Sequence, residues 1–281
     1  MKTAIIDVGG GLRGVYAAGV LDHCMDEQIS FDLCIGISAG SANVAAFLAG
    51  QRGRNYRYFT EYPSRREYMS LQNFLIKKSY LDLDYIYGTL SYSYGEDPLD
   101  YESLAANLAE CLVIACNART GETRYFTKQD FHKNDYSILK ASSAIPFVCH
   151  PYAVDGTLYF DGALGDTIPI DKAFDLGCER VVLVLTKPRD VLRTDKKDRA
   201  LARCIERRYP KAAQRLRGRA QRYNEGVAKA TEYEKQGKLL IVAPESTDGV
   251  DTLTKDKEAL QRLYQRGYRD GQAIRGFLSG D

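Results

Sequence analysis

The strongest candidate for chemistry is a serine set between small residues. Ser38 lies in the pentapeptide Gly-Ile-Ser-Ala-Gly, whose ends are Gly36 and Gly40. An apolar run precedes the pentapeptide and a helical pattern follows it, and small neighbours allow a serine to occupy the strained strand-to-helix turn called a nucleophile elbow. The N–H groups at the start of the helix would lower the cost of negative charge there. By itself the pentapeptide also suits a turn with a capping serine, but its position after a strand favours a nucleophile.

A second glycine-rich segment, Gly-Gly-Gly-Leu-Arg-Gly at residues 9–14, also joins an apolar run to a helical pattern. Glycines permit a tight turn that brings backbone N–H groups close to an anionic oxygen. A dinucleotide-binding loop has similar glycine spacing but requires an acidic residue at the end of the second strand. Here the only nearby acid, Asp32, precedes that strand. A phosphate-binding P-loop is excluded because no Gly-Lys-Ser or Gly-Lys-Thr follows.

A serine nucleophile needs a base, and a histidine or a carboxylate can serve. The sequence contains three histidines: His23 falls in the first helical pattern, His132 lies in a polar loop, and His150 precedes a proline. His150 could approach the serine, but no acid-and-histidine pair follows Ser38 in the way that a serine–histidine hydrolase requires. A carboxylate is therefore the better candidate.

Asp161 is the carboxylate that the sequence favours. It ends the apolar run 157–160 and is followed by Gly162 and Ala163, so its side chain would project from the end of a strand toward the serine turn. Asp155, in an upstream Asp-Gly pair between two short apolar runs, is typical of a hairpin turn instead. We therefore assign the base to Asp161 and turn formation to Asp155.

Short apolar runs alternate with helical patterns, and this alternation predicts a three-layer α/β/α domain with a mostly parallel central sheet. A hairpin is expected around residues 117–126. Strands are predicted at 3–8, 32–35, 111–116, 157–160, 181–185 and 239–242. Helices are predicted at 14–26, 41–50, 100–110, 137–143, 171–176 and 255–278.

The glycine loop, the Gly-x-Ser-x-Gly elbow and a late Asp-Gly-Ala, in that order, resemble the motif set of the patatin-like phospholipases. The segment Ala-Ser-Ser-Ala-Ile-Pro at residues 141–146 is similar to the one that precedes the aspartate in that family. The resemblance covers residues 2–185, and the last third of the chain is similar to the extension of bacterial patatin-family proteins. One variation is Ala163, where many members have glycine.

This resemblance implies a patatin-like fold, a catalytic Ser38–Asp161 dyad and no metal or organic cofactor. It implies a serine acyl hydrolase acting on acyl esters of lipids or phospholipids. The alternatives are a thioesterase or short-chain carboxylesterase, or a catalytically idle lipid-binding or regulatory protein on the same fold. Arg13 would either face an anionic group of the substrate or pair with an acidic neighbour. The implied oxyanion loop consists of Gly9, Gly10, Gly11 and Arg13, and the residues flanking the motifs are Gly14, Gly36, Gly40, Gly162 and Ala163.

The chain has 281 residues, 44% of them hydrophobic and 27% charged, which excludes a disordered or fibrous protein. We expect a patatin-like catalytic domain at residues 1–186 and a basic, mostly helical extension at 187–281 packed on it. Seven cysteines without a Cys-x-x-Cys pair predict reduced thiols and no metal site. The first residues lack the apolar run of a signal peptide. We therefore expect a cytoplasmic protein that meets lipid, if at all, as a peripheral protein at the inner membrane face.

Two segments stand apart by composition. Ten of the twenty tyrosines lie between residues 56 and 101, and packing is a commoner role for such a cluster than lipid contact. Residues 187–235 hold 16 Lys and Arg against seven Asp and Glu. Such an excess is usually a solvated face, although it could also hold a protein transiently on an anionic membrane surface. It lacks the features of a nucleic-acid module, so the expected partner is an acyl-lipid or ester substrate, and the oligomeric state is left open.

Overall fold

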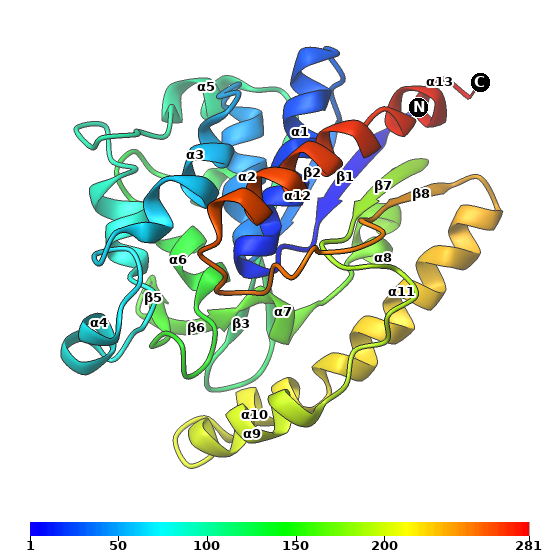
Figure 1. Ribbon diagram of the computed structural model, residues 1–281. Helices are drawn as coiled ribbons and strands as arrows, with labels where there is room; N and C mark the ends of the chain where they lie inside the picture. The colour runs from blue at the N-terminus through cyan, green and yellow to red at the C-terminus, as the bar shows by residue number, and fades with distance from the viewer. Residues whose placement is uncertain (281) are drawn as a thin grey trace.

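An eight-stranded sheet runs through the centre of the molecule in the computed structural model, which describes residues 1–280 (Figure 1). The strands are β1 (Thr3–Asp7), β2 (Leu33–Ile37), β3 (Glu110–Asn117), β4 (Thr123–Thr127), β5 (Tyr152–Val154), β6 (Thr157–Asp161), β7 (Arg180–Val184) and β8 (Leu239–Val242). Their order is β5-β6-β3-β2-β1-β7-β8, with β4 also paired to β3. From β3 to β8 along this order the neighbours are parallel, whereas β4 and β6 run antiparallel to β3.

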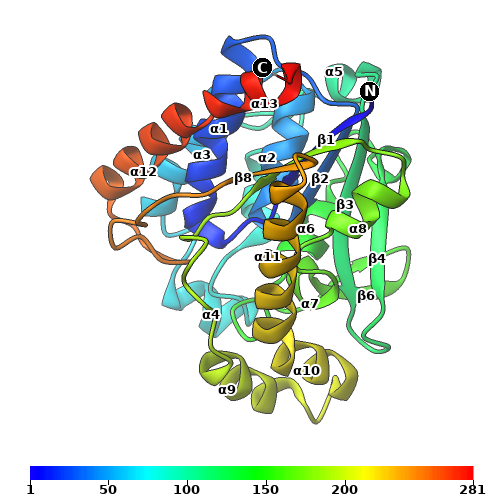
Figure 2. The same cartoon turned by 90° about the vertical axis from the view of Figure 1, so that its right-hand side faces the viewer.

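The central strands are buried on both faces, which explains why they read as unbroken apolar runs in the sequence. Ile5 and Cys34 face one core, whereas Ile6 and Ile35 face the other. The first core is covered by α1 (Val15–Asp26), α2 (Ala39–Leu48), α6 (Ser137–Ser143) and α12 (Lys257–Asp270), and the second by α8 (Ile170–Asp175) and α11 (Arg219–Lys235) (Figure 2). The three-layer α/β class that the sequence predicts is therefore confirmed.

The remaining helices are α3 (Arg54–Thr60), α4 (Leu71–Lys77), α5 (Tyr101–Ala106), α7 (Gly162–Gly165), α9 (Lys196–Ile205), α10 (Pro210–Arg217) and α13 (Ala273–Ser279). All six predicted strands are present, and so is the hairpin, which joins β3 to β4. The helix predicted at 100–110 is wrong beyond Ala106, because the Asn107 side chain accepts a hydrogen bond from the Ala109 amide at 2.9 Å and the chain turns into β3. The single helix predicted at 255–278 is also wrong, because it is interrupted between α12 and α13.

β3 is longer than the strands beside it, and its length positions the ends of two neighbours. Residues 110–114 pair with β2, and residues 115–117 pair with β6. β4 occupies the opposite edge, so β2 and β6 lie end to end along one edge of β3. Ile37 pairs with Ile114 and Asp161 pairs with Ala115. The last residue of β2 and the last residue of β6 therefore lie next to each other.

Residues beyond 186 contribute to the same sheet. β8 pairs in parallel with β7, and α12 packs along α1. The helices α9, α10 and α11 form the predicted helical part of this segment. A domain boundary at residue 187 stays a prediction. Within residues 1–280, no helix combines the length and the hydrophobicity that crossing a bilayer requires.

The backbones of α1 and α12 are in direct contact. A Cβ atom at Gly267 would lie 1.9 Å from the carbonyl oxygen of Tyr16, and one at Gly19 would lie 2.1 Å from that of Tyr264. The Tyr16 hydroxyl also donates a hydrogen bond of 2.6 Å to the carboxylate of Asp270 across this interface. Glycine is required at both contact points because any side chain would force the helices apart.

We expect Gly267→Ala to lower the free energy of unfolding by about 1–3 kcal/mol, because the added methyl group must push α12 away from α1. Gly276→Ala in α13 is the matched control, since its Cβ position has no neighbouring atom within 4 Å. The control should be neutral or stabilising by up to about 1 kcal/mol, as alanine favours helix. Urea denaturation of both variants measures the difference, and equal stabilities would contradict the backbone contact.

Candidate active site

Ser38 lies between the end of β2 and the start of α2 in a strained backbone conformation. Its φ and ψ are 56° and −130°, a combination that residues other than glycine rarely adopt. The turn is tight because glycines flank it. A Cβ at Gly36 would lie 2.4 Å from the Cα of Ser41, and one at Gly40 would lie 2.4 Å from the carbonyl oxygen of Asp7. This is the geometry of a nucleophile elbow, with the serine at the N-terminus of a helix.

Asp161 ends β6 and lies beside the elbow because β2 and β6 share one edge of β3. The residue is 2% exposed, and its Oδ1 accepts a hydrogen bond from the Ala163 amide at 2.8 Å. Burial raises the pKa of Asp161, and the nearby Ser38 side chain and the Ala163 amide oppose this rise. A carboxylate with a raised pKa next to a serine is suited to general-base catalysis because its proton affinity lies closer to that needed near neutral pH.

The end of α6 holds both residues of this pair. The hydroxyl of Ser142 accepts a hydrogen bond from the Ser38 amide at 2.9 Å, and the carbonyl of Ala144 accepts one from the Asp161 amide at 3.0 Å. Ser142 is fully buried. The sequence singled out residues 141–146 by resemblance alone, and these contacts supply a physical role: the segment fixes the serine turn relative to the end of β6.

Two arginines of the basic segment act on Asp161. The charges of Arg219 and Arg193 lower the pKa of this carboxylate, although their effects are smaller than those of burial and hydrogen bonding. Arg219 Nε donates to Asp198 at 3.0 Å, and the Arg193 guanidinium stacks on the ring of Tyr223, 3.4 Å from its centre. Part of the positive charge at residues 187–235 is therefore directed inward, where it favours the ionised form of the candidate base.

The glycine loop leaves two backbone amides free to bind an oxyanion. Gly9, Gly10 and Gly11 have φ angles of 65°, 137° and 61°, and a run of positive values is accessible essentially only to glycine. The Gly9 amide is occupied, because it donates to Asp7 Oδ1 at 2.8 Å. Within residues 1–280, the Gly10 and Gly11 amides donate to no protein acceptor. These two amides are the donors that remain for a substrate oxygen.

Arg13 is a buried residue that ties the glycine loop to the segment before α12. Its guanidinium donates to the carboxylate of Asp251, and to the Thr252 hydroxyl at 3.1 Å. The adjacent Leu12 amide donates to the carbonyl of Thr252 at 3.0 Å. Of the two roles that the sequence left open for Arg13, the structure contains the ion pair with an acidic neighbour.

Asp7 and Asn43 form a buried network that sequence reasoning missed. Asp7 accepts hydrogen bonds from the Gly9 amide and the Asn43 side chain, each at 2.8 Å. Asn43, on α2, also donates to the carbonyl of Gly14 at 3.0 Å. Burial raises the pKa of Asp7 to about 6, although both hydrogen bonds oppose the rise. The signal in the sequence was an acid at the end of a strand, two residues before the first glycine.

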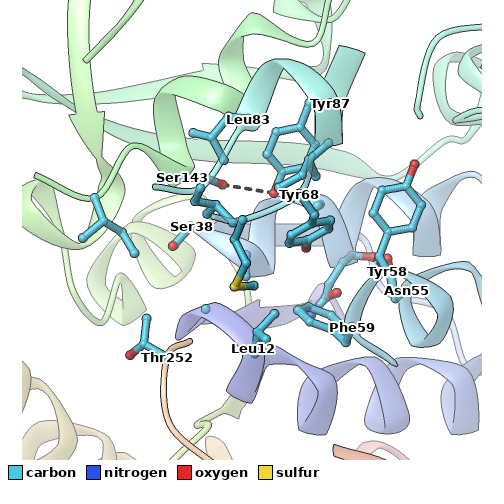
Figure 3. A pocket seen from close by; sticks show the side chains of 18 of the residues that line it. Leu12, Ser38, Asn55, Tyr58, Phe59, Tyr68, Leu83, Tyr87, Ser143 and Thr252 are labelled. Carbon is cyan, nitrogen blue, oxygen red and sulfur yellow. Dashed lines mark hydrogen bonds between the residues drawn. The ribbon is translucent and has the colours of Figure 1, made fainter. Parts of the chain in front are cut away.

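An apolar cavity opens beside Ser38. It offers about 620 Å³ of space, its mouth included, which lies within the range of small-molecule sites. Figure 3 shows Ser38 and Ser143 on one side and Tyr58 and Phe59 across from them. Other side chains that line it are Leu12, Tyr68, Met69, Leu81, Leu83, Ile86 and Tyr87. Three tyrosines of the cluster at residues 56–101 therefore form part of the cavity wall.

The histidines lie elsewhere in the part of the chain that the structure describes, since none of the three lines this cavity. His150 Nδ1 is 2.7 Å from the Ser79 hydroxyl. His23 is buried in α1, and His132 is exposed. Among residues 1–280, no three His, Cys, Asp or Glu side chains gather in a way that could hold a metal ion. The geometry therefore favours a carboxylate base over histidine.

Comparison with known proteins agrees with the motif order. The family model described as "Patatin-like phospholipase" matches residues 8–174, and that of a domain of unknown function, DUF6363, matches residues 209–274. The chain is 32% identical over 195 residues to "Uncharacterized protein YjjU" of Escherichia coli strain K12. That match covers 66% of this chain and 52% of the relative, so the chain spans about half the length of the curated relative. Among solved structures, VipD from Legionella pneumophila is similar, with a TM-score of 0.49 and 12% sequence identity. The match covers 97% of this chain and 66% of the VipD chain.

The raised pKa of Asp7 predicts a pH dependence of stability. The folded chain retains the Asp7 proton up to pH about 6, whereas the unfolded chain releases it near 3.8. The free energy of unfolding should therefore fall on account of Asp7 as the pH rises between these values, by at most about 3 kcal/mol. Asp7→Asn cannot titrate and should lack this fall.

Urea denaturation of wild type and Asp7→Asn at several pH values between 4 and 7 measures this effect. Other carboxylates titrate in both proteins, so the difference between the two curves isolates Asp7. Parallel curves would show that Asp7 is ionised in the folded protein throughout this range.

Proposed function

Because this chain belongs to the patatin-like phospholipase family, we propose that it is a serine acyl hydrolase that cleaves acyl esters of lipids or phospholipids, with Ser38 as nucleophile and Asp161 as base. The observation that carries the proposal is a strained serine, at φ 56°, that lies next to a buried carboxylate across neighbouring strand ends and lines an apolar cavity. Strain of this kind persists where function needs it. A catalytically idle binding protein gains nothing from it.

The proposed reaction begins when Asp161 takes the hydroxyl proton of Ser38. The serine oxygen then forms a bond to the ester carbonyl carbon, and the carbonyl electron pair moves onto its oxygen. When this intermediate collapses, the bond to the alcohol oxygen breaks, and the alcohol leaves with the proton from Asp161. Water repeats the same steps on the acyl-serine, so that the fatty acid leaves and Ser38 regains its proton.

The negative oxygen formed in each step needs donors that are already in place. We assign this role to the Gly10 and Gly11 amides, which lack protein acceptors within residues 1–280. Removing one such donor typically lowers the rate by roughly 10²–10³-fold. Gly9 and Arg13 support the loop in this scheme, through Asp7 and Asp251 respectively.

The walls of the cavity favour a hydrocarbon chain as the acyl group. Leu12, Phe59, Leu83 and Ile86 line it, and polar side chains such as Asn43, Arg54 and Asn55 lie among them. Burial of an acyl chain against such walls supplies the binding free energy that positions the ester at Ser38. We propose a cytoplasmic enzyme that takes its substrate from the inner membrane face.

A fluorophosphonate probe tests whether Ser38 is an activated nucleophile. Covalent labelling of wild type at Ser38, and its loss in Asp161→Asn, would support the dyad. A well-folded protein that is never labelled would instead favour the idle lipid-binding alternative. Rates on thioesters and on short-chain esters, measured beside phospholipids, distinguish the thioesterase and carboxylesterase alternatives.

We expect Ser38→Ala and Asp161→Asn each to lower kcat for ester hydrolysis by at least about 10³-fold, and the double variant to be no worse than either, because the two residues act as a unit. His150→Ala is the matched control and should keep most of the activity, since this side chain lies outside the cavity. Hydrolysis of p-nitrophenyl esters is measured for these four variants and for wild type. If His150→Ala were as inactive as Ser38→Ala at normal stability, the base would be histidine.

A further inference from the structure

α4 exposes apolar side chains that nothing covers within residues 1–280. Leu71, Leu75 and Ile76 are 74%, 71% and 69% exposed, and Phe147 beside them is 51% exposed. The ring of Phe74 packs against Phe147, with 5.7 Å between their centres, and Leu71 and Leu75 lie on the same face of α4 as Phe74, with Ile76 at the edge of that face. Figure 1 shows α4 projecting from the body of the molecule, away from α9 and α10. A contiguous apolar surface of this kind marks an interaction site. We call it the α4 surface.

α4 is fastened to the protein on its opposite side, which keeps the apolar residues facing outward. The hydroxyl of Ser70 caps the helix by accepting from the Asn73 amide at 3.1 Å. The buried side chain of Asn73 donates to the carbonyls of Arg66 and Glu67, each at 3.1 Å. The chain is thus held in place by polar contacts, and the exposure of the leucines is a feature of the fold.

The α4 surface borders the mouth of the candidate active site. Met69 and Leu81, which flank α4 in the chain, form a β-bridge with each other and both line the cavity. Ile145, two residues before Phe147, lines it as well. Leu253, in the segment before α12, also lines the cavity and is 36% exposed. Apolar side chains therefore continue from the α4 surface into the cavity.

Positive charge lies around this surface. Lys78 follows α4 directly and is exposed. Lys255 is also exposed, and its Nζ donates to the carbonyl of Met69 at 3.0 Å, which places it beside the start of α4. Apolar side chains at the centre with lysines near the edge match a lipid surface, where acyl chains lie below a layer of phosphates.

We propose that the α4 surface docks the protein on a phospholipid bilayer, with Leu71, Leu75, Ile76 and Phe147 inserted at the acyl boundary and the cavity mouth facing the lipid. This inference rests on the proposed function for what the docked enzyme does, because a lipid leaving the bilayer passes along apolar side chains to Ser38. α4 lies within the tyrosine-rich segment at residues 56–101. In this proposal the leucines and the isoleucine of α4, and not the tyrosines, contact the lipid. Because the contact with lipid is mainly apolar, vesicle binding should persist at high salt concentration.

Co-sedimentation with vesicles of equal parts phosphatidylcholine and phosphatidylglycerol tests the proposal. The triple variant Leu71→Gln, Leu75→Gln and Ile76→Gln should reduce partitioning by at least about tenfold at both 0.1 and 0.5 M salt. The matched control replaces three apolar residues exposed elsewhere, Leu108, Val191 and Leu192, with Gln; these are 100%, 52% and 73% exposed. It should bind like wild type. Every protein used in the binding measurement also carries Ser38→Ala, so that no lipid is hydrolysed during the experiment.

Activity separates this proposal from the proposed function. The α4 variant should hydrolyse vesicle lipid at least about tenfold more slowly but keep its kcat/KM on soluble p-nitrophenyl butyrate, which shows that it is folded. If wild type binds vesicles through α4 yet hydrolyses nothing, docking stands and the hydrolase assignment falls. If the α4 variant retains full vesicle binding, docking through α4 is wrong.

Two further outcomes would also overturn the proposal. The first concerns Arg203, Arg207 and Lys211, which are exposed and have no ion-pair partner within residues 1–280. If replacing these three with Gln abolishes vesicle binding and changing α4 does not, the membrane contact belongs to the basic segment. Gel filtration that shows a wild-type dimer split by the α4 substitutions, without vesicle binding by either protein, would make the surface a contact between copies of this chain.

Discussion

β3 has eight residues where β2 and β6 have five each, and this difference in length brings the two residues of the candidate dyad together. β2 pairs with the first part of β3 and β6 with the last, so Ser38 and Asp161 meet although they lie far apart in the chain. The end of α6 then bonds one amide on each side of this junction. A shift of β6 by one residue would turn Asp161 to the other face of the sheet.

Burial of charge is the second constraint on the site. Asp7 and Asp161 are both almost inaccessible to water, and burial raises the pKa of each. Each carboxylate accepts from the amide two residues later, that of Gly9 or Ala163, so the same local contact occurs at the ends of β1 and β6. Such contacts matter because a buried carboxylate without donors is costly. The sequence indicates that the basic segment is a solvated face, but two of its residues, Arg193 and Arg219, lower the pKa of Asp161.

Short-range patterns were sufficient to predict the strands, the glycine loop and the family, because turns and strand ends are encoded by neighbouring residues. Ser38 and Asp161 were selected on such signals, and their roles stay predictions that the geometry supports. Contacts between distant segments could not be predicted in this way: nothing near Arg13 in the chain indicates Asp251. Periodicity also shows where apolar side chains align but not what covers them, so the exposed face of α4 had no signature of its own.

The contacts of the glycine loop with residues 251 and 252 have a consequence for biosynthesis. Chains fold as they leave the ribosome, N-terminal parts first. Arg13 and Leu12 emerge early, but their partners Asp251 and Thr252 arrive only after all eight strands have been made. An unfinished chain can assemble much of its sheet while the loop that would bind the oxyanion is still unsupported. The candidate site would thus be completed only once residues 251 and 252 have been made, and a chain truncated before them would leave the glycine loop without these contacts.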